Sequence, residues 1–155
     1  MENKDIIFMK EALSLARKAG ELGEIPVGAL VVSNTGDIIA GAYNLRESKK
    51  SATAHAELLA IENACEALGG WRLGGCTLYV TLEPCPMCAG AIVNSRIDRV
   101  VFGAYDMQAG CCGSLINFNA YPFNHSFDIK GGVLEAECQA LLTEFFSKKR
   151  KDLFS

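Results

Sequence analysis

Residues 76–104 read CTLYVTLEPCPMCAGAIVNSRIDRVVFGA, and this stretch decides the fold class. Over residues 76–82 apolar side chains alternate with Thr and Tyr, a pattern that predicts a β-strand. A helix is expected over about residues 86–94, and a second strand over residues 99–104, where apolar and β-branched residues return. Strands that alternate with helices in this way are typical of layered α/β proteins.

The segments on either side continue the alternation. Residues 4–20 are expected to form an amphipathic helix, because apolar residues recur there at helical spacing. A β-hairpin should follow, with strands at 27–33 and 38–43 around the turn Asn34-Thr35-Gly36-Asp37. The hairpin makes the expected sheet a mixed one. The remaining expectations are a helix from about Thr53 to Gly69, irregular chain over 105–128, and a last helix whose apolar stripe contains Leu134, Cys138, Leu141, Leu142 and Phe145.

Length and composition favour one soluble globular domain over residues 1–155. Hydrophobic residues make up 50% of the chain and charged residues 21%, which suits one sizeable core and excludes a disordered chain. The longest apolar run, residues 25–32, is far shorter than the ~18–20 residues that a membrane span needs. The first residues, MENKD, lack the basic and then apolar pattern of a secretory signal, so a cytoplasmic location is expected.

Cysteine content and net charge narrow the possible chemistry. The chain has seven cysteines, an odd number that cannot pair completely, which indicates free or metal-bound thiols in a reducing compartment. The net charge of −3 argues against nucleic-acid binding through overall attraction. A local basic patch is still available at residues 148–151, which read Lys-Lys-Arg-Lys.

Two short segments contain a candidate metal site, TAHAE at residues 53–57 and EPCPMC at residues 83–88. Cys85 and Cys88 are three residues apart at an expected helix start, so both thiols can face one ion, and the helix N-terminus favours their thiolate form. With His55 they make a three-ligand set suited to Zn²⁺, which leaves a fourth position for water and indicates a catalytic site. Glu57 lies roughly 200° around an ideal helix from His55, so it is expected to act as a base and not as a ligand.

Other interpretations of these cysteines are open. A Cys-x-x-Cys pair can be redox-active or simply buried, and a fourth ligand such as Cys76 or Cys112 would make the zinc site closed and structural. Cys65, Cys76 and Cys138 fall in phase with apolar stripes and are expected in the core. The adjacent Cys111 and Cys112 would chelate one ion awkwardly, so a loop role or a liability to oxidation is expected for them.

The joint pattern is more specific than its parts. His-x-Glu, followed about thirty residues later by Pro-Cys-x-x-Cys, is the signature of zinc nucleobase deaminases. Over nearly its whole length the chain resembles the bacterial tRNA-specific adenosine deaminases. The resemblance covers residues 23–29 (GEIPVGA), Asn44, 78–85 (LYVTLEPC), 95–97 (SRI), 100–104 (VVFGA), Asp106, 113–115 (GSL), 124–125 (NH), 132–134 (GVL) and 145–146 (FF). Ser51-Ala52, Tyr105 and Cys111-Cys112 depart from the family pattern.

The zinc motifs alone would also fit cytosine, cytidine or guanine deaminases, and Pro86 is a residue often seen in guanine deaminases.

The resemblance implies a cytidine-deaminase-like fold, a three-layer α/β/α sandwich with a mixed sheet of about five strands. It implies a homodimer that converts the wobble adenosine of a tRNA anticodon loop to inosine, with one Zn²⁺ per chain held by His55, Cys85 and Cys88. Glu57 would move protons between the attacking water and the adenine ring. The substrate-binding residues that we expect are Asn44, Ala56 through its peptide N–H, Asp106, Phe145 and Arg150.

The basic run at residues 148–151 has two interpretations. It can be a solvated helix end that interacts favourably with the helix dipole. With Phe145 and Phe146 beside it, it can also follow RNA phosphates and stack a base, which the resemblance favours.

Two other functions are open. One is a deaminase of free bases or nucleosides, which needs a closed pocket and no basic surface. The other is a non-catalytic zinc scaffold, and the presence of Glu57 argues against it.

Overall fold

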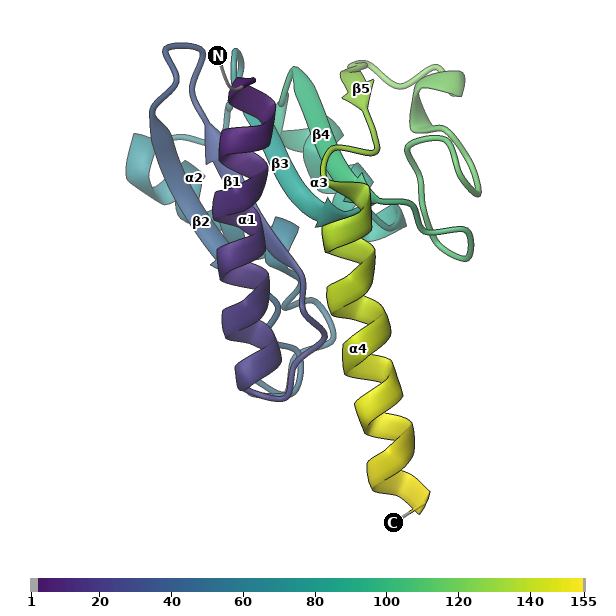
Figure 1. Cartoon of the computed structure of the whole chain (residues 1–155). Coiled ribbons are helices and arrows are strands. Elements are labelled where there is room, and N and C mark those ends of the chain that lie inside the picture. Colours follow the sequence, from purple (N-terminus) through teal and green to yellow (C-terminus); the bar gives the residue numbers. More distant parts are fainter. Residues whose placement is uncertain (1–2, 155) are drawn as a thin grey trace.

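Helices and strands alternate along residues 3–154, the part of the chain that this computed structural model describes (Figure 1). The strands are β1 (Gly28–Val32), β2 (Ile38–Tyr43), β3 (Thr77–Leu82), β4 (Arg99–Ala104) and β5 (Asp128–Lys130). The helices are α1 (Lys4–Glu21), α2 (Ala56–Leu68), α3 (Pro86–Ser95) and α4 (Glu135–Phe154), with a short 3₁₀ turn at Phe118–Ala120.

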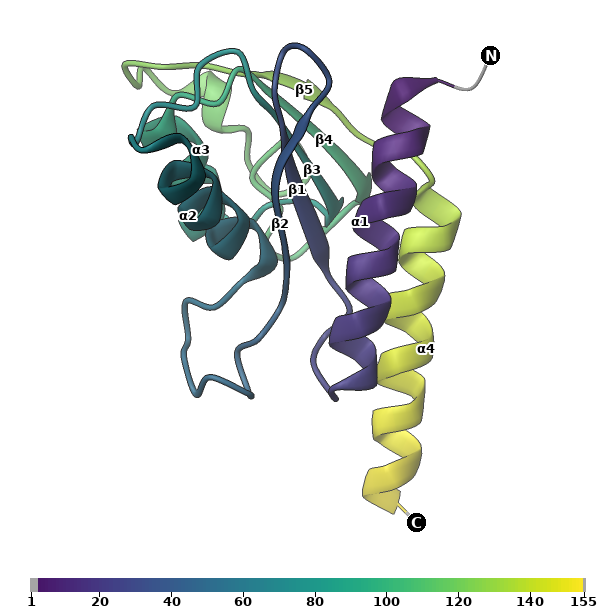
Figure 2. The same ribbon diagram turned by 90° about the vertical axis from the view of Figure 1, so that its left-hand side faces the viewer.

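The strands form one mixed sheet in the order β2-β1-β3-β4-β5. β1 pairs antiparallel with both β2 and β3, whereas β3, β4 and β5 are parallel. Figure 2 shows α1 and α4 on one face of the sheet and α2 and α3 on the other. The predicted three-layer α/β/α sandwich is therefore confirmed. None of the helices in residues 3–154 combines the length and apolar character that a membrane span requires.

The centre of the sheet is buried on both faces, and its sequence reflects this. Every residue of β1 is buried, and so are the interior residues of β3 and β4, which explains their continuous apolar runs. Helix α1 packs closely on β1 because Gly28 has no side chain. A Cβ at this position would overlap the backbone of Ala12 and Ala16 in α1.

The observed elements differ from the predicted ones at three places. Helix α2 begins at Ala56 and not near Thr53, because His55 has an extended backbone and is the residue that caps the helix. β5 was not predicted as a strand: its three residues are mostly exposed and depend on pairing with β4. Leu134 lies before α4 with a φ of 53°, so the apolar stripe of that helix begins at Cys138.

The three cysteines expected in the core are not buried to the same degree. Cys76 and Cys138 are 4% and 1% exposed, as expected. Cys65 is only half-buried, and its thiol donates to the carbonyl of Trp71. The position of Cys65 near the end of α2 explains this difference.

A buried carboxylate joins α1 to three strands at the edge where the parallel strands begin. Asp5 accepts hydrogen bonds from the Tyr79 hydroxyl (2.7 Å), from both terminal nitrogens of Arg99 (2.9 and 2.8 Å) and from Lys130 (3.0 Å). The Arg99 guanidinium, with the Tyr79 and Lys130 hydrogen bonds, holds the pKa of Asp5 well below its ordinary value. The ionised form of Asp5 therefore stabilises the folded state.

We expect Asp5→Asn to lower the free energy of unfolding at pH 7 by about 2–3 kcal/mol, because hydrogen bonds to a charged acceptor are lost. Since the pKa of Asp5 is lowered on folding, this contribution is present above about pH 4 and is lost as the pH falls through the folded-state pKa. Urea unfolding of both proteins between pH 7 and pH 3 should give a difference that shrinks with acidification. A difference that stays constant would mean that ionised Asp5 is not its source.

Candidate active site

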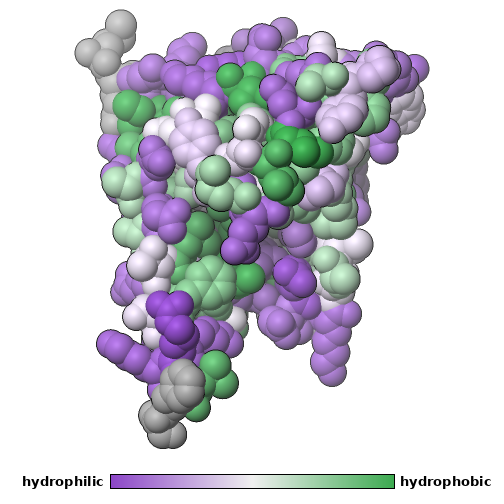
Figure 3. Space-filling view, turned by 90° about the vertical axis from the view of Figure 1, so that its right-hand side faces the viewer, coloured by the Kyte–Doolittle hydropathy of each residue, from purple (hydrophilic) through white to green (hydrophobic). Residues whose placement is uncertain are grey.

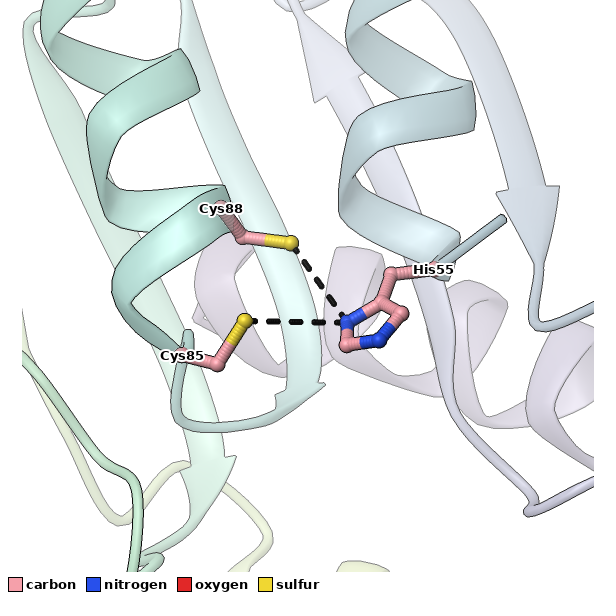
Figure 4. A group of neighbouring side chains, drawn as sticks. All are labelled: His55, Cys85 and Cys88. Carbon is pink, nitrogen blue, oxygen red and sulfur yellow. Dashed lines mark hydrogen bonds between the residues drawn. The ribbon is translucent and has the colours of Figure 1, made fainter. Parts of the chain in front are cut away.

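His55, Cys85 and Cys88 gather at the N-terminal ends of two helices (Figure 4). His55 immediately precedes α2 and Cys85 immediately precedes α3, while Cys88 lies in the first turn of α3. The Sγ atoms of Cys85 and Cys88 each lie 3.7 Å from Nδ1 of His55. All three potential ligand atoms are within 4.8 Å of one another, so they surround one point.

The geometry of these three atoms fits a tetrahedral zinc site. With zinc–sulfur and zinc–nitrogen bonds of about 2.3 and 2.0–2.1 Å, neighbouring sulfur and nitrogen ligands should lie about 3.6 Å apart. The observed separations of 3.7 Å agree with this value. In residues 3–154 no fourth Cys, His, Asp or Glu joins the group. This argues against the closed structural site that Cys76 or Cys112 would complete.

The electrostatics of the group also suit a cation. Hydrogen bonds from Cys88 and His55 lower the pKa of Cys85 to about 4, so Cys85 is a thiolate. The same hydrogen bond to Cys85, together with burial, raises the pKa of Cys88, and the Cys85 contact raises that of His55. Both helix N-termini point their positive dipole ends at the group and favour negative charge there. A metal ion would replace the shared protons as the partner of these ligands.

Glu57 lies in the first turn of α2, beside the three ligands, and is 4% exposed. Burial raises the pKa of its carboxyl to about 7. A carboxyl with a pKa near the working pH can both accept and donate a proton. His55 precedes the helix with an extended backbone, whereas Glu57 lies in the first helical turn. In this arrangement both residues line the same cavity. This is the arrangement in which Glu57 is free to act as a base.

A cavity of about 630 Å³ opens next to these residues, within the range that is usual for small-molecule sites. His55, Ala56, Glu57 and Cys85 line its base. One wall comes from residues 105–109, and another from Ile25, Val27, Asn44 and Arg46. In the space-filling view, two hydrophilic projections flank a hollow with hydrophobic surface between them, and the end of α4 is one of the two (Figure 3).

Helix α4 supplies the remaining wall of the cavity through one stripe of side chains. Four of them recur at intervals of three or four residues, and Leu142 lies next to one of these, so all five share one helix face: Gln139, Leu142, Thr143, Phe146 and Arg150. The part of α4 that lines the cavity extends away from the sheet (Figure 1). The helix therefore carries lining residues of the cavity beyond the end of the sheet.

Four of the five substrate-binding residues predicted from sequence line this cavity: Asn44, Ala56, Asp106 and Arg150. The fifth, Phe145, is not among the lining residues; it is half-buried and packs edge-to-face on Phe146. Phe146 lines the cavity instead. Sequence reasoning also missed Tyr105, Met107 and Gln108, for which a loop without periodicity offered no signal.

Asn44 has an unusual hydrogen-bonding state. Its side chain is buried, and Nδ2 donates to the carbonyl oxygen of Ile25 at 3.3 Å. Its Oδ1 atom is buried and finds no hydrogen-bond partner in residues 3–154. A buried acceptor without a partner costs about 1–3 kcal/mol. Asn44 thus combines an unsatisfied acceptor with a position in the lining of the cavity.

Asp106 shapes the loop that it belongs to. Its Oδ1 atom accepts the backbone N–H groups of Gln108 (3.0 Å) and Ala109 (3.1 Å). Such local hydrogen bonds from an aspartate define a turn. The carboxylate thus sets the course of residues 106–109 along the cavity wall.

Comparisons with known proteins agree on one family. The profile of the cytidine and deoxycytidylate deaminase zinc-binding region matches residues 2–104. The tRNA-specific adenosine deaminase of Bacillus subtilis (strain 168) is 56% identical over 149 residues, which cover 96% of this chain and 92% of the relative. A solved tRNA:A34 deaminase, studied for A-to-I editing at the wobble position, has a TM-score of 0.84 at 46% identity and covers 87% of this chain and 98% of its own. A guanine deaminase from Nitrosomonas europaea has a TM-score of 0.78 at 26% identity, covering 88% of this chain and 81% of its own.

The profile match includes the three candidate zinc ligands and Glu57. These are the residues that α2 and α3 bring together at the base of the cavity. Sequence and geometry thus lead to the same conclusion: the chain belongs to the zinc-dependent cytidine and deoxycytidylate deaminase family.

Proposed function

We propose that this protein deaminates the wobble adenosine of a tRNA anticodon loop to inosine, and that residues 1–155 form a single deaminase domain. The observation that carries the reaction type is the buried Glu57 beside His55, Cys85 and Cys88 at the base of an open cavity. The relatives at 56% and 46% identity, a tRNA-specific adenosine deaminase and a tRNA:A34 deaminase, support the substrate.

The chemistry follows from these residues. His55, Cys85 and Cys88 would hold one zinc ion per chain, which supplies a Lewis acid that makes water acidic near pH 7. Glu57 accepts a proton from the attacking water as its oxygen adds to C6 of adenine, and delivers a proton to N1. The same carboxyl then takes the second proton from the hydroxyl group now on C6 and gives it to the amine. The bond between C6 and the amine nitrogen breaks, ammonia departs, and inosine remains with a carbonyl at C6. One buried carboxyl thus serves each proton transfer.

The rest of the cavity recognises the nucleotide. The unpaired Oδ1 of Asn44 accepts a hydrogen bond from the bound nucleoside, which recovers the energy that its burial costs. The anticodon loop is single-stranded, so its target base only needs to leave the loop stack. Phe146 and Arg150, both exposed lining residues, offer a stacking surface and a cation for the neighbouring nucleotides.

Pro86 does not require a guanine substrate. It is the first residue of α3, where proline is favoured because the missing N–H would have no helical partner. Its occurrence here is therefore explained by the helix that presents the cysteines. The guanine deaminase alternative is left to the substrate test.

The test is inosine formation in total tRNA, measured with and without a zinc chelator, alongside free adenosine, guanine and cytidine. We expect conversion of tRNA alone, at its wobble adenosine, and loss of that activity in chelator. Conversion of free guanine or cytidine without conversion of tRNA would overturn the proposal.

We also propose that the protein acts as a homodimer in the cytoplasm, since the family resemblance implies a homodimer and a tRNA substrate implies a cytoplasmic enzyme. Sedimentation of the purified chain at micromolar concentration tests the dimer. A monomer that retains full activity on tRNA would contradict it.

The basic run at residues 148–151 should contribute to RNA affinity in a salt-dependent way. Each phosphate neutralised on a single strand contributes about 0.7 to the slope of log affinity against log salt. Replacing Lys148, Lys149, Arg150 and Lys151 with Gln is expected to weaken binding and flatten this slope by about one to three units. Asn44→Ala serves as the contrast: it should reduce turnover and leave the slope unchanged, because it contacts the base. Binding isotherms at several salt concentrations measure both. An unchanged slope in the quadruple variant would leave the run as a solvated helix end.

A further inference from the structure

Glu83 is a buried carboxylate that joins the cysteine-bearing loop to one wall of the cavity, and it is itself one of the lining residues. It directly follows β3, lies two residues before Cys85, and is 2% exposed. Its Oε1 atom accepts the backbone N–H of Asp106 (3.0 Å) and the hydroxyl of Ser114. Its Oε2 atom accepts the backbone N–H groups of Cys112 (3.0 Å) and Ser114 (3.1 Å). All four donors thus belong to one loop.

This loop also forms a wall of the substrate cavity. Residues 105–109 line the cavity, and residues 106–114 supply the hydrogen bonds to Glu83. A fifth hydrogen bond, from the N–H of Cys111 to the carbonyl of Pro84 (2.9 Å), joins the same two segments. Gly110 lies so close to Glu83 that a Cβ there would overlap its carboxyl group. The wall is therefore held against the segment that carries Cys85.

We propose that Glu83 is a positioning residue that fixes the distance between this cavity wall and the reacting centre. The proposal rests on the deaminase function given above. His55, Glu57 and the two cysteines are on the ends of α2 and α3, not on residues 105–114. Displacement of the wall should therefore weaken substrate binding and leave the proton-transfer groups in place. Such a change raises KM more than it lowers kcat.

Glu83→Gln is the most informative change, because it keeps the volume of the side chain and replaces one acceptor oxygen with an NH₂ group. At the Oε1 position, the Ser114 hydroxyl can rotate to accept from the new amide, but the Asp106 N–H cannot. At the Oε2 position, both donors are backbone N–H groups. In either orientation at least one backbone N–H faces the amide NH₂. The loop must then shift.

The experiment compares wild type, Glu83→Gln and Asp5→Asn for zinc content, melting temperature, and kcat and KM on an anticodon stem-loop. Asp5→Asn is the matched control, since it also converts a buried carboxylate with several donors to an amide, at the opposite ends of β3 and β4. For Glu83→Gln we expect a KM about tenfold higher, kcat within threefold of wild type, and full zinc content. For Asp5→Asn we expect a lower melting temperature with unchanged kcat and KM.

A second variant tests the same contact from the other side. Gly110→Ala keeps the Glu83 carboxylate but adds a methyl group that would overlap this carboxylate and the backbone carbonyl of Asp106. The loop must move to make room for it, so this variant should also raise KM selectively. This variant decides the question if Glu83→Gln does not fold. Amide hydrogen exchange of Asp106, Cys112 and Ser114 gives a readout without substrate, and Glu83→Gln should accelerate it.

Three outcomes would overturn the proposal: an unchanged KM in Glu83→Gln and Gly110→Ala, a loss of zinc that accounts for the whole defect, or unchanged exchange in residues 106–114. A wild-type protein that is inactive on tRNA would instead refute the proposed function. In that case the exchange measurement still decides whether Glu83 holds the loop.

Discussion

Replacing Glu57 with Ala is expected to lower the rate of inosine formation by about 10³- to 10⁴-fold, since general acid–base catalysis contributes 10²–10⁴-fold and this residue serves more than one proton transfer. Zinc content should stay at the wild-type level, because Glu57 lies outside the His55, Cys85 and Cys88 group. The tRNA affinity should also stay at the wild-type level, because the role proposed for Glu57 is proton transfer. Single-turnover rates, tRNA binding and zinc content measure the three quantities separately.

Glu62→Ala is the control for this prediction, because Glu62 is an exposed glutamate of the same helix, α2. It should have wild-type activity. Glu57→Gln adds an isosteric variant that preserves packing but cannot take up the proton, and it should be as inactive as Glu57→Ala. If either Glu57 variant kept more than a few per cent of the wild-type rate, Glu57 would not be the proton carrier.

Removal of the two cysteine ligands should have an effect of similar size on activity and a further effect on folding. We expect the double variant Cys85→Ala, Cys88→Ala to lose its zinc, its activity and part of its stability, because metal binding contributes to the folding free energy. The single variant Cys88→Ala should lose both metal and stability as well. Zinc per chain is measured by elemental analysis, and stability by thermal unfolding.

Cys76→Ala is the matched control for the metal site. Cys76 is buried, as Cys88 is, but it precedes β3 and lies outside the ligand group, so its variant should retain zinc. Loss of zinc from Cys76→Ala would restore the closed-site interpretation. Full zinc occupancy in the double cysteine variant would rule out the proposed ligands.

The sequence allowed the central elements and the metal ligands to be predicted for a physical reason. β3 and β4 are buried, so their apolar patterns are dense, and the turn before β2 has distinctive residues. The ligands His55, Cys85 and Cys88 are chemically specific and occur at spacings that a helix start can use. For these features the local sequence contains most of the information.

The features that were not predicted depend on contacts between distant parts of the chain. Asp5 meets Arg99 and Lys130, and Glu83 meets Ser114, only after the sheet has formed. β5 exists because β4 offers it a partner. The difference between Phe145 and Phe146 has the same origin: adjacent residues on a helix differ by about 100° in direction, and packing decides which one faces the cavity.

The stripe of α4 that lines the cavity constrains the length of the chain as well as its composition. Gln139, Phe146 and Arg150 face the cavity because whole turns separate them, counted from the start of the helix beside β4. One residue inserted ahead of Gln139 would rotate all of them by about 100° away from the cavity. A seven-residue insertion would restore their direction but move them about 10 Å along the helix axis. Relatives that share this site should therefore vary in the length of this helix only beyond Arg150.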